Sequence, residues 1–173
     1  MKKFNLILLA IAATFLMVSC RGKQGPMGPQ GPQGNANVVS STLTVQSSDW
    51  YFDNNTSWRV DIDYDAIDMD IFEDGAVFVY MKEGDTWRQI PLTFYYSLTN
   101  SDGSESFYSS SLEVSYYLNG VSIFWTENDF YDGYRPDTRD FKIVAIAASL
   151  YNSRKDIDYS NYEAVEKAFM LDR

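Results

Sequence analysis

The residues closest to a metal-ligand pattern are five aspartates whose carboxylate oxygens would suit a hard cation such as Ca²⁺. They are Asp61, Asp63, Asp65, Asp68 and Asp70. Their spacing departs from an EF-hand loop, because Ala66 stands at the turn-glycine position and Phe72 at the last ligand position. The pattern favours the solvated face of a strand that runs into a turn, and leaves a calcium site as the alternative.

Catalytic chemistry finds little support in the sequence. The chain has no histidine and one cysteine, Cys20, which excludes His-based nucleophile triads and His or thiolate zinc sites. With 24 acidic residues, some carboxylate pair lies close by chance, so hydrolysis by paired acids has no specific signal. We therefore expect a protein that is not an enzyme and holds no metal or cofactor.

Two polar segments carry aromatic residues that could stack on sugar faces. One contains Trp50, Tyr51 and Phe52, and the other contains Phe130, Tyr131 and Tyr134. We take Trp50, Tyr51, Tyr131 and Tyr134 as candidate ligand-binding residues on exposed loops. The alternative is that these rings cover the ends of a β-sandwich.

Cys20 is the candidate for covalent modification. Lys2 and Lys3 precede an apolar run over residues 6–18, which is shorter than the roughly 20 residues of a membrane-spanning helix but typical of a signal peptide. The run ends in Leu16-Met17-Val18-Ser19-Cys20, which resembles a bacterial lipobox. That resemblance implies cleavage after Ser19 and lipidation of Cys20; the alternative is ordinary cleavage that leaves a free thiol.

Lipidation would place the protein in the cell envelope, because several acyl chains anchor stably where one is marginal. Arg21, where inner-membrane retention would call for Asp, implies the outer membrane. Glycine then recurs at positions 22, 25, 28, 31 and 34, with Pro26, Pro29 and Pro32 between, which is the collagen pattern. We favour an extended stalk, with a homotrimer wound through this spacer as the alternative. The predicted organisation is a signal peptide (1–19), a lipidated cysteine and spacer (20–34) and one domain (35–173).

The domain shows the two-residue periodicity of β-strands over residues 58–65 and a nearly continuous apolar run over 141–148. Further strands are expected at 38–45, 76–82 and 87–94, the last with Pro91 at an edge or bulge. Asn119-Gly120 predicts a two-residue hairpin loop that pairs Leu118 with Val121. Ser160 and Glu163 form a capping-box pattern before a short C-terminal helix. We predict a mainly β protein, an antiparallel sandwich of about seven strands.

The formal net charge is −10 for the chain and becomes −12 once residues 1–19, which carry Lys2 and Lys3, are removed. Phosphate binding needs a basic surface, so a nucleic-acid partner and polybasic docking on anionic lipid are both excluded. The membrane would be reached through the N-terminal lipid alone.

Four segments, together with the lipobox and spacer, resemble collagen-like lipoproteins of Bacteroidota. These segments are 74–80 (DGAVFVY), 87–92 (WRQIPL), 141–146 (FKIVAI) and 161–165 (NYEAV). The family has no assigned activity, so the resemblance implies architecture and location and supplies no site residue. Our first hypothesis is a non-catalytic, lipid-anchored envelope protein with a structural or adhesive role. The alternative is a glycan-binding module that uses loop aromatics.

Overall fold

The computed structural model describes residues 37–130 and 133–171, which belong to the second of the chain's two units, Gly34–Arg173. The predicted signal peptide, Cys20, the spacer and Tyr131 lie outside the described residues.

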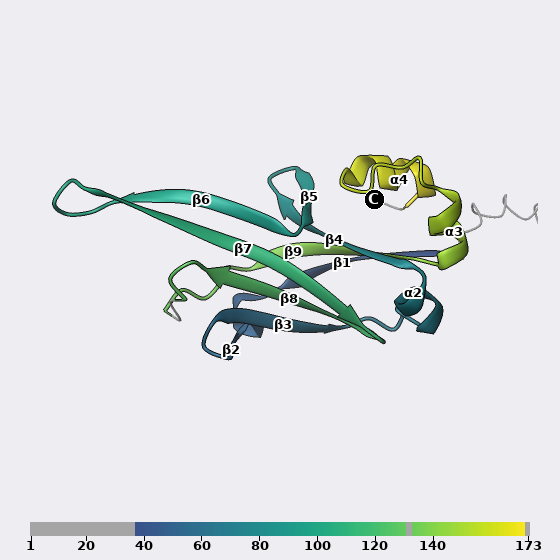
Figure 1. Ribbon diagram of the computed structural model, residues 1–173, viewed down its shortest axis with the longest axis horizontal. Helices are drawn as coiled ribbons and strands as arrows, with labels where there is room; N and C mark the ends of the chain where they lie inside the picture. The colour runs from purple at the N-terminus through teal and green to yellow at the C-terminus, as the bar shows by residue number, and fades with distance from the viewer. Residues whose placement is uncertain (1–36, 131–132, 172–173) are drawn as a thin grey trace, which may run out of the picture. The chain divides into compact units, whose positions relative to one another are not determined.

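Two antiparallel sheets pack face to face (Figure 1), as the sandwich prediction requires. The four-stranded sheet has the order β1-β9-β4-β5, and the five-stranded sheet has the order β2-β3-β8-β7-β6. The described residues thus form nine strands where about seven were expected. The strands are β1 (Val38–Val45), β2 (Tyr51–Asp53), β3 (Ser57–Asp63), β4 (Ala76–Glu83), β5 (Thr86–Ile90), β6 (Leu92–Thr99), β7 (Glu105–Tyr117), β8 (Gly120–Glu127) and β9 (Arg139–Ile146). The helices are η1 (Ser47–Asp49), α2 (Met69–Glu73), α3 (Ala148–Ser153) and α4 (Tyr162–Phe169).

The main core lies between the two sheets. Val79 and Met81 of β4 and Ile143 of β9 face Ile123 of β8 and Val60 of β3, and all five side chains are buried. In these strands, every second side chain points into the core, because successive side chains of a β-strand lie on opposite faces of the sheet. This core fixes the separation of the sheets.

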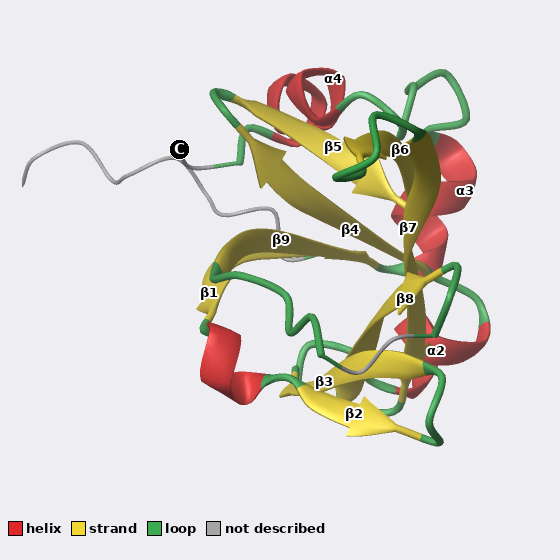
Figure 2. Cartoon of the chain, turned by 90° about the vertical axis from the view of Figure 1, so that its left-hand side faces the viewer, coloured by secondary structure: helices red, strands yellow, loops and turns green. Residues whose placement is uncertain are grey.

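A second core covers the other face of the four-stranded sheet. Helices α3 and α4 lie on that face, away from β3 and β8 (Figures 1 and 2). Val144 and Ile146 of β9 pack there with Val165 and Phe169 of α4. Because β9 is buried on both faces, its sequence is nearly continuously apolar, and the prediction of a central buried strand is confirmed.

The segment predicted as one strand over 87–94 is two strands in different sheets. β5 pairs with β4 and ends at Ile90, and β6 begins at Leu92 and pairs with β7. Pro91 lies between them, after a cis peptide bond. A proline has no N–H to donate to a ladder, so the chain leaves one sheet here and enters the other.

The predicted β7–β8 hairpin exists, but its register is shifted by two residues. Tyr117 pairs with Gly120, and Tyr116 pairs with Val121. The predicted pairing of Leu118 with Val121 is wrong, because Asn119 is held outside the ladder: its N–H donates to Ile67 O and its carbonyl accepts from Tyr64 N–H. A shift of two residues preserves side-chain direction, so Val121, Ile123 and Trp125 are buried. Tyr116 and Leu118, which the predicted pairing also directs to the core face, are exposed.

The C-terminal helix is confirmed, with its start one residue later than predicted. Asn161 is the N-cap, and its side chain accepts hydrogen bonds from the N–H groups of Glu163 and Ala164. Ser160 instead bonds Asp158. Of the helices in the described segments, none has the length and apolarity needed to cross a bilayer.

Candidate ligand-binding site

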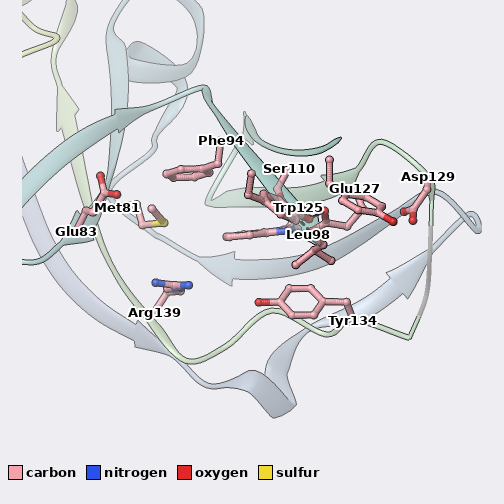
Figure 3. Close-up of a pocket in the computed structure, with 12 residues that line it drawn as sticks. Met81, Glu83, Phe94, Leu98, Ser110, Trp125, Glu127, Asp129, Tyr134 and Arg139 are labelled. Carbon is pink, nitrogen blue, oxygen red and sulfur yellow. Dashed lines mark hydrogen bonds between the residues drawn. The ribbon is translucent and has the colours of Figure 1, made fainter. Parts of the chain in front are cut away.

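An open cleft of about 780 Å³ lies where the two sheets separate at one end of the sandwich (Figure 3). It forms because β6 and β7 extend beyond β4 and β5 (Figure 1), which leaves part of their inner face uncovered. Strands of both sheets and the loop after β8 contribute the lining, which consists of Met81, Glu83, Phe94, Tyr96, Leu98, Tyr108, Ser110, Trp125, Glu127, Asp129, Tyr134 and Arg139.

Strand β6 supplies one wall through its alternate residues. Phe94, Tyr96 and Leu98 line the cleft, whereas the intervening Tyr95 is 83% exposed. The two-residue period of a strand accounts for the difference, since neighbouring side chains leave opposite faces. Of these two adjacent tyrosines, therefore, only Tyr96 lines the cleft.

The aromatic side chains of the wall are held in stacked pairs. Phe94 stacks on Trp125 of β8 with ring centroids 6.2 Å apart and an interplanar angle of 13°. Tyr96 stacks on its cross-strand partner Tyr108 at 5.8 Å and 18°. Such pairs stabilise each ring in one orientation, so the cleft presents a preorganised aromatic surface.

The buried carboxylate of Glu127 holds two of these rings, Tyr96 and Trp125, by hydrogen bonds. Glu127 is only 6% exposed and accepts hydrogen bonds from Tyr96 Oη (2.6 Å), Trp125 Nε1 (2.6 Å) and Ser110 Oγ (2.8 Å). A buried carboxylate is costly unless it is hydrogen-bonded, and these three donors come from three adjacent strands. Burial and the bond to Glu127 raise the pKa of the Tyr96 hydroxyl above its ordinary value, which keeps it a donor.

Arg139 brings a positive charge to the cleft. Its guanidinium carbon lies 5.8 Å from the Trp125 ring centroid, and its Nε is buried without a hydrogen-bond partner. The ion pairs formed among residues 37–130 and 133–171 do not include Arg139. Glu83, which also lines the cleft, is paired with Arg88 at 2.6 Å.

The four candidate aromatic residues have different positions. Tyr134 lines the cleft. The expectation of an exposed Trp50 is wrong, because Trp50 is 1% exposed and packs edge-on against Phe141 in the main core. Tyr51 is exposed on β2, where its hydroxyl donates to Asp61. Tyr131 lies outside the described residues.

The aspartate cluster is divided among separate structural roles. Asp61 accepts bonds from Tyr51, Arg59 and Ser122, and Asp68 caps α2. Within the described segments, no group of three or more Asp, Glu, His or Cys side chains is arranged to hold a metal ion.

Most cleft residues were missed from the sequence. Only Tyr134 was named as a candidate, while Phe94, Tyr96, Glu127 and Arg139 were not. Two signals were present: Phe94, Tyr96 and Leu98 are spaced two residues apart, as on one face of a strand, and Trp125 and Glu127 have the same spacing. Neither reveals by itself that the facing sheet ends early.

Comparison with protein-family models, with curated proteins and with solved structures finds no match for this chain. The cleft offers flat aromatic faces, hydroxyl groups fixed by Glu127 and one guanidinium, which together suit reversible binding of a ligand that has both apolar faces and polar groups.

Proposed function

We propose that the protein is a non-catalytic, lipid-anchored protein of the cell envelope that binds a glycan in the cleft between its two sheets. The observation that carries this proposal is the aromatic surface of Phe94, Tyr96 and Trp125. The buried Glu127 accepts hydrogen bonds from Tyr96 and Trp125, and Phe94 stacks on Trp125.

A glycan fits this surface for two reasons. Sugar rings have apolar faces that stack on aromatic rings, and their hydroxyl groups pair with donors and acceptors at the edge of those faces. The cleft combines both kinds of group, and its volume falls within the range of about 300–1,000 Å³ typical of ligand pockets.

The N-terminal region supports display of this domain from a membrane. Lipid chains on Cys20 would anchor the protein. The 14 residues from 21 to 34, extended at about 3.1 Å per residue, would hold the domain as much as about 40 Å away. An adhesive role at the outer membrane follows from a glycan-binding domain tethered in this way. Chains wound as a trimer through the spacer would add avidity.

A glycan array probed with the full-length protein in detergent tests the proposal. We expect reproducible binding that Tyr96→Ala reduces at least tenfold. Tyr95→Ala is the matched control, because it removes the same side chain from the opposite face of β6 and should leave binding unchanged. A blank array, or equal loss in both variants, would contradict glycan binding in the cleft.

A further inference from the structure

We propose that the cleft selects an acidic glycan and that Arg139 binds the carboxylate of a uronic acid residue. This inference rests on the proposed function, because it identifies the class of glycan that the same site takes.

The first observation is the unsatisfied guanidinium. Arg139 Nε is buried without a hydrogen-bond partner, and the described residues supply no ion-pair partner for this side chain. A buried polar group without a partner is destabilising. Nε itself is covered, and a ligand carboxylate in the cleft would instead supply the ion-pair partner that the described residues do not give this guanidinium.

The second observation concerns the side chains that surround the Arg139 guanidinium. Arg139 lies against the ring of Trp125 in a cleft that the apolar side chains of Phe94, Leu98 and Met81 also line. An ion pair is stronger beside apolar groups than in bulk water, because the effective dielectric constant is lower there. A guanidinium also matches the two oxygens of a carboxylate in a bidentate geometry.

The nearby carboxylates restrict the charge of the ligand. Glu127 and Asp129 line the same cleft, and the mature chain carries a formal net charge of −12. Glu83 also lines the cleft but is paired with Arg88, so beside one guanidinium a singly charged carboxylate is less unfavourable than a doubly charged phosphate. A sugar carboxylate brings a single charge attached to a ring that can stack on the adjacent aromatic surface.

The carboxylate must approach Arg139 while the sugar ring contacts the aromatic wall. Figure 3 shows Arg139 and Trp125 on neighbouring sides of the cleft, with Phe94 facing the same space. Glu127 does not compete for the guanidinium, because its oxygens already accept bonds from Tyr96, Ser110 and Trp125.

Calorimetry on the full-length protein in detergent tests the inference with three probes. The probes are oligogalacturonate, its methyl ester, and a neutral galactose oligomer of equal length. We expect oligogalacturonate to bind at least tenfold more tightly than the other two, with an affinity that decreases as salt concentration rises. Arg139→Gln should remove this preference and leave the weaker binding of the neutral probes within twofold.

Arg135→Gln is the control, because Arg135 lies over the ring of Trp58 outside the cleft and should leave all three affinities unchanged. Thermal unfolding of both variants verifies that they fold. Equal affinity for acidic and neutral probes would overturn the role of Arg139 while glycan binding stands. Binding of none of the probes would overturn this inference, and a blank glycan array would overturn the proposed function as well. Tight binding of a peptide with a free terminal carboxylate, but of no uronate, would also overturn it.

Discussion

Trp125 Nε1 donates a 2.6 Å hydrogen bond to Glu127 Oε1, which lies two residues further along the same strand. The two side chains share the inner face of β8, where Tyr96 and Ser110 complete the donor set of the carboxylate. The cleft surface and a buried polar network are thus parts of one structure, and the stability of the domain is linked to the shape of its site.

Substitution of Glu127 tests that link. Glu127→Gln retains an acceptor for Trp125, and the hydroxyls of Tyr96 and Ser110 can turn to accept from the new amide. We expect a loss of about 1 kcal/mol in the free energy of unfolding. Glu127→Ala leaves the indole N–H buried and unpaired and should cost about 3 kcal/mol. Urea unfolding followed by tryptophan fluorescence measures both, and equal stability of the two variants would contradict this role.

The start of helix α4 is tested by two neighbouring substitutions. Asn161→Ala removes the side chain that accepts from the first free N–H groups of the helix and should cost about 1 kcal/mol. Faster amide exchange across 162–169 should accompany that loss. Ser160→Ala, which removes only an exposed bond to Asp158, should change stability by less than half as much. A larger loss of stability for Ser160→Ala than for Asn161→Ala would indicate that Ser160 is the N-cap.

The hydrogen bonds of Asp61 should make the stability of the fold depend on pH in the acidic range. Burial opposes ionisation of this carboxyl, but hydrogen bonds from Ser122, Tyr51 and Arg59 outweigh it and hold the pKa below its ordinary value of 3.8. A lowered pKa in the folded state stabilises the fold above pH 4, and this contribution is lost as the pH falls through the folded value.

Asp61→Asn should therefore be less stable than the parent protein at pH 7, and the difference should shrink at pH 3. Urea unfolding at both pH values measures it. Asp65→Asn, at an exposed position of the following turn, is the control. A difference for Asp61→Asn that stayed constant between the two pH values would show that the network does not depend on the charge.

Gly75 lies where a larger residue would meet backbone. A Cβ added there would come within 2.5 Å of Ile146 O and 2.7 Å of Ile71 Cα. We expect Gly75→Ala to cost about 1–3 kcal/mol or more, because neither backbone atom can move without disturbing β9 or α2. Gly103→Asn is a tolerant control, since its surroundings are open and Asn accepts a positive φ. Unchanged thermal stability of Gly75→Ala would contradict the close packing.

Features that depend on local pattern were predictable from the sequence. The bounds of β1 agree with the predicted 38–45, and β9 was recognised from its apolar run. Tyr162, Val165 and Phe169 are all buried on one face of α4, as their helical spacing indicates.

Features that depend on distant contacts were not predictable. The hairpin register is set by bonds from Asn119 to residues 64 and 67, and Trp50 is buried because Phe141 lies beside it in the fold. The cleft requires that β6 outreach the facing sheet, which depends on the crossing at Pro91. No local periodicity encodes the relative lengths of two sheets, so the sequence did not identify Glu127 as part of a site.

The indole N–H signals of the four tryptophans provide a direct test of the proposed glycan binding in the cleft. Trp125 lines the cleft, whereas Trp50, Trp58 and Trp87 do not. On titration of the ¹⁵N-labelled protein with oligogalacturonate, we expect the Trp125 signal to shift and the other three to remain in place. Movement of the Trp58 or Trp87 signal, with Trp125 unaffected, would contradict it.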